Sequence, residues 1–451
     1  MSNSPHLSWF GIIRLGLVQT ALGAIVVLTT STLNRIMVVE YGMVAVIPGA
    51  LVGLHYAVQM SRPRWGYGAD IGGRRTPWII GGMAVLAFGG ALAALGTAVM
   101  GAALYLGLGI AILAFVLIGI GVGAAGTSLL TLLATQVSEK HRPAAASIVW
   151  IMMIAGFAIT AIAAGTQLDP YSPTRLVVVS STVSVVAFLV CLAAIYRVEK
   201  APSKTWESEL ERRSEKQPFR EAFAEVWNEP KARQFTIFVF VSMLAYSAQD
   251  LILEPFAGLV FGFTPGESTK LTGLQSGGVM VGMIVVAIAG SAIGGRRFGS
   301  LRMWAVGGCL ASALAFVGLV VSAHVGPAWP LRVNVFFLGL ANGAFAVAAI
   351  GSMMGLAGQG QEKREGTRMG LWGAAQAIAF GLGGFLGTVA IDLARAALGT
   401  PVMAYSVVFA GEAVLFVVSA TIAFKVAPGA SALAKSSERE ARAGHALQAA
   451  E

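Results

Sequence analysis

Two carboxylates, Asp250 and Glu254, stand four residues apart inside an otherwise apolar stretch of the chain. Positions i and i+4 of a helix lie on one face, so the two side chains would be neighbours. Ionisable groups at bilayer depth are costly and mark candidate sites, and this pair can bind a proton or a cation, or pair with an arginine. Gln249 precedes the pair, and Pro255 would bend or end the helix. The alternative is two hydrated carboxylates near the mouth of a helix, with no special role.

His55 lies alone in a second apolar run. Imidazole can supply an axial nitrogen to a metal or to a magnesium tetrapyrrole, which makes His55 a candidate pigment ligand. The alternative is a packed, hydrogen-bonded core histidine. The two cysteines, Cys191 and Cys309, lie in separate apolar runs, so neither a disulfide framework nor a metal site is expected.

These residues belong to a chain whose composition excludes a soluble globular protein. Of its 451 residues 56% are hydrophobic and 12% charged, against about 25% charged in ordinary domains. Crossing a bilayer takes about 20 apolar residues in a helix, because backbone groups cannot stay unpaired in hydrocarbon. We predict an all-α polytopic membrane protein with twelve transmembrane helices. Their expected bounds are 11–32, 42–60, 78–99, 102–135, 144–166, 176–196, 234–260, 270–291, 303–324, 333–357, 369–392 and 402–424.

The basic residues predict the orientation of these spans. All but five of the 31 Lys and Arg residues fall on the side that holds both termini. The five exceptions are Arg35, Arg175, Lys270, Arg332 and Arg395. By the positive-inside rule both termini are cytoplasmic, and the expected location is a bacterial inner membrane. The net charge of +9 then reflects orientation, and no nucleic-acid partner is expected.

The longest polar stretch divides the spans six and six. We therefore expect an N-terminal half at 1–196, a cytoplasmic linker at 197–233, a C-terminal half at 234–425 and a cytoplasmic tail at 426–451. Within the linker, apolar side chains recur at helical spacing, at Phe219, Phe223, Val226 and Trp227. This pattern predicts a helix on the membrane surface, with a partly disordered linker as the alternative.

An internal repeat relates the two halves. A constant offset of 222 residues brings Gly73-Arg74-Arg75 onto Gly295-Arg296-Arg297, and Trp150 onto Trp372. Two six-helix repeats with a long central linker resemble the major facilitator superfamily. In that fold the first and seventh spans line a central cavity, so Arg35 is expected to approach Asp250 or Glu254. Local pairing of Arg35 with Glu40 is the alternative.

The loop after the second span carries a motif that resembles the superfamily's signature. Its residues are Gly66, Asp70, Gly73, Arg74 and Arg75. Asp70 can accept hydrogen bonds from basic residues or a helix N-terminus, so the motif is a candidate cytoplasmic latch. Ile71 stands where a basic residue is usual, and a plain topogenic turn explains the arginines equally well.

Two further motifs resemble the PucC/LhaA family, also called the bacteriochlorophyll delivery family. They are Asn34-Arg35 with Met37 and Glu40, and Gln249-Asp250 with Leu253-Glu254-Pro255. The resemblance implies a carrier and assembly factor that delivers bacteriochlorophyll to light-harvesting complexes of purple bacteria. It implies bacteriochlorophyll as cargo, a carotenoid as a further candidate, and antenna polypeptides, bacteriochlorophyll synthase and membrane lipid as partners. The compact loop after the second span looks like the branch encoded beside bacteriochlorophyll synthase.

Enzymatic prenyl transfer is not expected. It needs paired aspartate-rich motifs to hold magnesium diphosphate, and the four aspartates here are scattered singly, at Asp70, Asp169, Asp250 and Asp392. No other catalytic motif stands out, so we expect no enzyme. The alternative function is a secondary transporter of a small solute that uses Asp250 and Glu254 for proton coupling. Arg35, Glu40 and Gln249 complete the candidate cavity.

Overall fold

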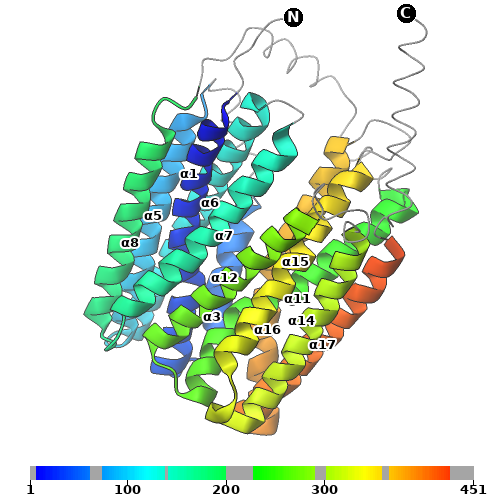
Figure 1. Cartoon of the computed structure of the whole chain (residues 1–451). Coiled ribbons are helices and arrows are strands. Elements are labelled where there is room, and N and C mark those ends of the chain that lie inside the picture. Colours follow the sequence, from blue (N-terminus) through cyan, green and yellow to red (C-terminus); the bar gives the residue numbers. More distant parts are fainter. Residues whose placement is uncertain are drawn as a thin grey trace, which may run out of the picture.

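The computed structural model describes residues 7–60, 74–137, 141–199, 227–289, 301–357 and 365–426, and within them the chain is helical almost throughout (Figure 1). The first group of helices comprises α1 (Trp9–Val27) with its continuation η1 (Leu28–Thr32), α2 (Leu33–Arg35) and η2 (Ile36–Glu40), then α3 (Val46–Gln59), α5 (Thr76–Met100), α6 (Leu104–Gln136), α7 (Arg142–Gln167) and α8 (Pro173–Ile195). The second group comprises α11 (Pro230–Phe261), α12 (Pro265–Ala289), α14 (Leu301–Val325) with a short turn η4 (Gly326–Ala328), α15 (Leu331–Ala357), α16 (Glu365–Leu398) and α17 (Pro401–Val426).

The predicted all-α membrane fold is confirmed. Eleven helical spans among the described residues are long and apolar enough to cross a bilayer, and α3 is a shorter apolar helix of 14 residues. Backbone N–H and C=O groups within a helix pair with one another, which is the condition for crossing hydrocarbon.

The first helix runs further than the sequence predicted. We expected it to end at 32, where polar residues begin, but its helical run continues to Glu40 through two segments of wider, π-helical turns. The Thr29 and Thr30 hydroxyls donate to backbone carbonyls one turn back, and Arg35 is 2% exposed. Most of the polar side chains in this segment therefore find hydrogen-bond partners inside the protein, so the helix can continue through them.

The seventh span ends within one residue of its predicted end at 260, and Pro255 does not end it. Pro255 lies inside α11, and the helix continues to Phe261. Gly262, with φ of 70°, ends it in a left-handed conformation that favours glycine.

The two groups are six-helix repeats that pack alike. In the first group α1 packs against α7 and α8, and α5 packs against α6 and α8. In the second group α11 packs against α16 and α17, and α14 packs against α15 and α17. The predicted domain boundaries stay predictions, since residues 200–226 of the linker, including most of the predicted surface helix, lie outside the described residues.

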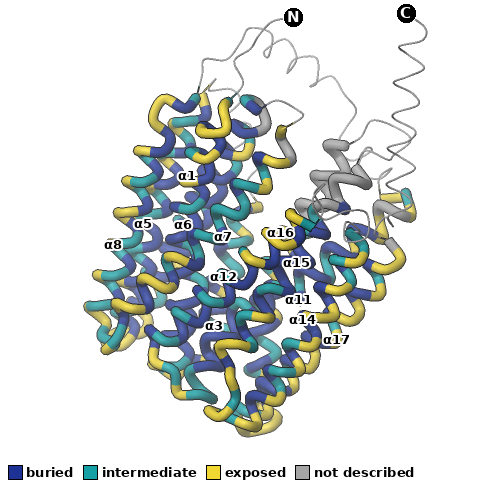
Figure 2. Tube along the Cα trace, viewed as in Figure 1, coloured by how far each residue is buried: buried dark blue, intermediate teal, exposed yellow. Residues whose placement is uncertain are grey.

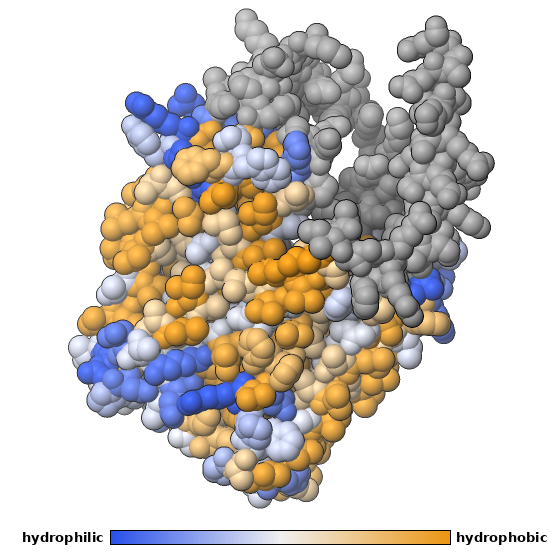
Figure 3. All heavy atoms as spheres, in the orientation of Figure 1, coloured by the Kyte–Doolittle hydropathy of each residue, from blue (hydrophilic) through white to orange (hydrophobic). Residues whose placement is uncertain are grey.

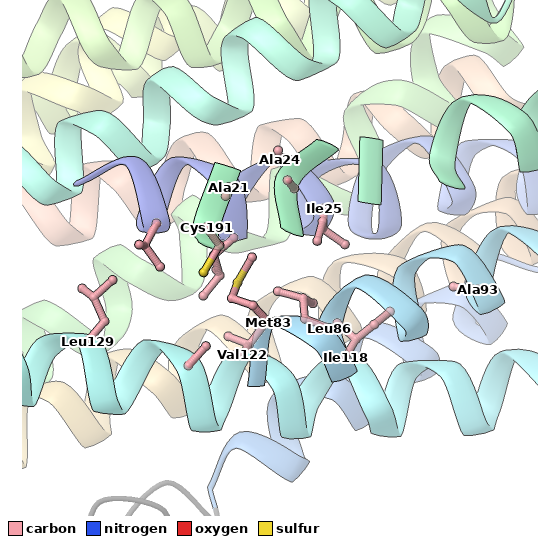
Figure 4. Packing of buried hydrophobic residues seen from close by; sticks show 14 of the residues in the cluster. Ala21, Ala24, Ile25, Met83, Leu86, Ala93, Ile118, Val122, Leu129 and Cys191 are labelled. Carbon is pink, nitrogen blue, oxygen red and sulfur yellow. The ribbon is translucent and has the colours of Figure 1, made fainter. Parts of the chain in front are cut away.

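Each repeat has its own apolar core. In the first, side chains from α1, α5, α6 and α8 meet around Ile25, Leu86, Ile118 and Cys191 (Figure 4). The second core is rich in aromatic rings. In it Phe256 of α11 packs edge-on against Phe409 of α17, with 5.0 Å between the ring centroids. Buried residues lie between the helices (Figure 2), and hydrophobic side chains cover most of the middle of the face in Figure 3, as lipid contact requires.

The repeats meet through two equivalent helix pairs, α7 with α12 and α3 with α16. We call the end where α1 begins the upper end, and the end where α12 begins the lower end (Figure 1). The polar contacts between the repeats gather toward the lower end, where helix starts and helix ends from both repeats lie together. The candidate site lies just above them.

Candidate functional site

The continuation of α1 crosses to the second repeat through its polar side chains. The Asn34 amide donates to the carbonyl oxygen of Leu251 in α11 at 2.5 Å. The Thr32 hydroxyl lies 3.0 Å from the hydroxyl of Thr269 in α12. These contacts place the polar end of the first helix against α11, as the repeat predicted, and also against α12.

Arg35 is the buried centre of this contact. Its guanidinium forms an ion pair with Glu40, and Nη2 donates to the carbonyl oxygen of Phe263 at 2.6 Å. No ion pair joins Arg35 to Asp250 or Glu254, and the ion pair present is the local alternative, with Glu40. The Arg35 charge does act on Glu254, as the predicted approach requires. Glu40 lies five positions after Arg35, and the wide π-helical turns of η2 bring residues at this spacing onto one face. The two side chains can therefore meet while the guanidinium still reaches the second repeat.

The two carboxylates of α11 have different surroundings. Glu254 is 1% exposed and accepts a hydrogen bond from the Thr272 hydroxyl, while its other oxygen has no hydrogen-bond partner. Asp250, one turn away, faces a cavity between the repeats. Gln249 is fully buried, and neither end of its amide is hydrogen-bonded. The predicted cluster therefore lies inside the bundle, and its hydrogen-bonding capacity is largely unused.

The cavity that Asp250 faces has a volume of about 60 Å³. The first helix contributes Thr30 and Ser31, and α12 contributes Thr272, Gln275 and Ser276. Apolar side chains of α7 close it, and Tyr246 of α11 lies beside Asp250. The cavity is thus a small space where the two repeats meet, lined by oxygen-bearing side chains on one part and apolar side chains on the other.

His55 lies in α3, away from this cavity. It is 2% exposed, its Nε2 is 2.8 Å from Nε2 of Gln59, and its ring packs edge-on against Tyr56. A magnesium tetrapyrrole would have to take the place of a neighbour to reach either nitrogen. His55 as a pigment ligand therefore stays a prediction.

Only part of the predicted latch can be placed. Gly66, Asp70 and Gly73 lie outside the described residues. Arg74 is exposed and Arg75 is 6% exposed. The backbone N–H groups of Arg75 and Thr76, where α5 begins, donate to the carboxylate of Glu199 at 2.7 and 2.8 Å. This carboxylate caps a helix within one repeat.

Two aspartates that the sequence analysis passed over join the repeats at the lower end. Asp392 of α16 accepts hydrogen bonds from the backbone N–H groups of Ala45 and Val46, at 3.0 and 2.7 Å, where α3 begins. A carboxylate at a helix N-terminus satisfies free N–H groups and complements the helix dipole. Asp392 therefore fixes α16 to the start of α3.

The second aspartate does the same at the repeat-related position. Asp169, after α7, accepts from the Thr264 hydroxyl at 2.8 Å and from the Gly266 N–H at 3.1 Å, where α12 begins. The two aspartates are 223 residues apart, one more than the repeat offset. We call this pair of contacts, at Asp169 and Asp392, the lower clasps. Their near-equivalence in the repeat was the signal that could have identified them.

Removing the clasp charges is expected to loosen the lower end. An asparagine can accept through only one oxygen and carries no charge, so Asp169→Asn and Asp392→Asn should each lower the free energy of unfolding by about 1–2 kcal/mol. Thermal unfolding of the purified protein measures this. Labelling of an Ala45→Cys variant, made without Cys191 and Cys309, should be faster in the double clasp variant.

Glu199→Gln is the matched control, because it weakens a similar cap inside one repeat. It should lower stability without changing the labelling rate. Equal labelling rates in the clasp variant and the control would show that the aspartates do not hold the repeats together.

Comparison with known proteins gives the family. A profile of the PUCC protein family matches residues 32–430, which is most of the chain. This chain belongs to the PucC family. A Rhodobacter capsulatus protein named "Bacteriochlorophyll synthase 44.5 kDa chain" is 51% identical over 417 residues, covering 92% of this chain and 95% of that protein. "Protein PucC" of Rhodobacter capsulatus is 30% identical, covering 92% of this chain and 91% of its own length.

Solved structures show the fold of this PucC-family protein to be that of major facilitator transporters. A D-xylose-proton symporter superposes with a TM-score of 0.69 at 12% identity, covering 93% of this chain and 98% of the symporter. A bacterial homologue of the human lysosomal transporter Spinster, in an inward-facing and unoccupied conformation, superposes with a TM-score of 0.65 at 16% identity. The match covers 94% of this chain and 98% of that homologue. At these identities the likeness establishes the fold alone.

Proposed function

We propose that this PucC-family protein is a carrier and assembly factor that delivers bacteriochlorophyll to light-harvesting complexes. The family match over residues 32–430 carries the proposal. It is supported by the relative whose name refers to bacteriochlorophyll, since 95% of that protein aligns with this chain. Antenna polypeptides are the proposed recipients, and bacteriochlorophyll synthase and a carotenoid are further proposed partners.

The proposal places the protein in the bacterial inner membrane with both termini in the cytoplasm. The bias of basic residues toward the side that holds both termini supports this orientation. The upper end is then cytoplasmic, and the lower clasps close the opposite end. The arrangement is that of a facilitator protein closed on the non-cytoplasmic side.

The pigment in this proposal lies outside the closed cavity. A volume of about 60 Å³ is far below the several hundred Å³ typical of sites for drug-sized ligands. A tetrapyrrole with a long prenyl tail fits an apolar, lipid-facing surface better, and such surface is abundant on the outer faces of the helices.

No catalytic step is part of the proposal. The three described aspartates serve different places, because Asp169 and Asp392 form the lower clasps and Asp250 faces the cavity. A site for magnesium diphosphate would need carboxylates side by side. The word synthase in the relative's name belongs to that protein.

A pigment-making host that lacks this gene provides the test. We expect antenna complexes to fall strongly while bacteriochlorophyll is still synthesised, and expression of the wild-type chain to restore them. Normal antenna assembly in the deletion strain would contradict the proposal. Loss of bacteriochlorophyll synthesis itself would also contradict it, because that result indicates an enzyme.

A secondary transporter of a small solute is the second candidate function. The specific observation in its favour is Asp250, a carboxylate that faces a cavity between the repeats. Solute uptake into proteoliposomes, driven by a proton gradient and lost in Asp250→Asn, would favour the transporter over the pigment carrier.

A further inference from the structure

The cavity beside Asp250 has an unusual balance of charge. Asp250 forms no hydrogen bond or ion pair with any residue that the structure describes. Arg35 is already paired with Glu40, and Glu254 lies close enough to share its field. The Arg35 charge thus serves Glu40 and Glu254, and the charged group near Asp250 is a further buried carboxylate, Glu412. Among the described residues the charge of Asp250 is left without a positive partner. A carboxyl group within the membrane span stays ionised only beside a compensating positive charge, and otherwise takes up a proton.

The polar residues that line the rest of the cavity, on the first helix and on α12, offer oxygen lone pairs, while apolar side chains such as Ile154 and Phe157 of α7 form the remainder of the lining. The Thr272 hydroxyl donates its hydrogen to Glu254, and the Thr30 hydroxyl donates to the carbonyl of Val26 at 3.0 Å. With their hydrogens used elsewhere, both oxygens can act as ligands. Ser31, Gln275 and Ser276 add further oxygens. Thr30 and Ser31 lie in η1, whose wider π-helical turns often occur at functional sites.

The side chains that line this cavity favour one class of ligand over others. Divalent hard cations take several carboxylates in protein sites, whereas Asp250 is the only carboxylate lining this cavity. In the described parts of the chain, no cluster of three or more His, Cys, Asp or Glu side chains could hold a metal ion. The volume of about 60 Å³ admits a small ion with a little water but no organic solute.

We propose that this cavity binds a monovalent metal cation of the size of Na⁺. Asp250 supplies the negative charge, and the oxygens of Thr30, Ser31, Thr272, Gln275 and Ser276 replace water around the ion. The ligands come from both repeats, since η1 belongs to the first and α11 and α12 to the second. Cation binding therefore joins the repeats at mid-membrane and favours the state with the lower clasps closed.

Thermal unfolding of purified, pigment-free protein tests the site. Samples in NaCl and in choline chloride at equal ionic strength and pH separate a specific cation from general screening. We expect Na⁺ to raise the melting temperature of the wild type. The stabilising free energy should follow RT ln(1 + [Na⁺]/Kd), where Kd is the dissociation constant of the site. Asp250→Asn should abolish this shift. Thr272→Val should raise the apparent Kd several-fold.

Glu267→Gln is the matched control, because Glu267 is a partly exposed carboxylate on the same helix as Thr272 but outside the cavity. It should keep the wild-type response. Binding of ²²Na⁺ to the wild type gives a second readout should Asp250→Asn fail to fold. No saturable ²²Na⁺ binding, or equal stabilisation by acidification in choline chloride alone, would overturn the proposal. The assay needs no pigment, so its failure is distinct from failure of the proposed carrier function.

Discussion

Replacing Arg35 with alanine is expected to lower the free energy of unfolding by about 3 kcal/mol, because it leaves the buried carboxylate of Glu254 and the partly exposed carboxylate of Glu40 without their cation. Arg35 is 2% exposed and bonds both Glu40 and the Phe263 carbonyl. Removing one partner of a buried ion pair typically costs about 3–5 kcal/mol of unfolding free energy. We expect a loss at the lower end of that range, since the Glu40 side chain is 31% exposed. The yield of monodisperse protein and its melting temperature in detergent measure the loss.

Two further variants sharpen this prediction. Arg332→Ala breaks an ion pair whose partners are 63% and 38% exposed, and such pairs contribute little, so its melting temperature should stay near that of the wild type. A double-mutant cycle with Glu40→Ala should show coupling between Arg35 and Glu40. Additive effects in that cycle would mean that the ion pair does not stabilise the fold.

The second large effect is expected at Gly343, where α12 and α15 approach closely. A Cβ added at Gly343 would overlap the carbonyl oxygen of Val279, and one at Gly282 would overlap that of Leu340. Helices in membranes associate through such close backbone contact. Gly343→Ala must separate the helices, and we expect a loss of about 2–3 kcal/mol of stability.

Gly277 in α12 provides the control for this substitution, since a Cβ there meets nothing within 4 Å. Gly277→Ala should leave the melting temperature unchanged or slightly higher, because alanine favours a helix more than glycine does. If the two alanine variants unfold at the same temperature, close packing at Gly343 is not what holds α12 against α15.

Much of the fold could be predicted from the sequence, because the length of apolar segments is dictated by the bilayer. The repeat offset also predicted which helices are equivalent, and the packing of α1 with α7 and of α11 with α16 agrees. The end of the first helix was less predictable. Its polar residues look like a loop in isolation, but side chains and backbone of the second repeat satisfy them.

The sequence predicted where the candidate site lies better than it predicted which of its charged side chains pair. Sequence spacing placed Asp250 and Glu254 on one helix, while the choice of Glu40 as the partner of Arg35 depends on the wide turns between them. Asp169 and Asp392 look unremarkable singly, since each lies near the end of an apolar span. Only comparison of the two repeats, or the structure, connects them with the starts of α12 and α3.

The absorption spectrum of the protein purified from a pigment-making host is the direct test of the proposed pigment carrier. We expect bound far-red-absorbing bacteriochlorophyll in a fixed ratio to protein, present also in Asp250→Asn because the pigment lies outside the cavity. Loss of the band in His55→Ala, with an unchanged melting temperature, would identify the ligand. Colourless wild-type protein from a host with abundant bacteriochlorophyll would contradict the carrier function.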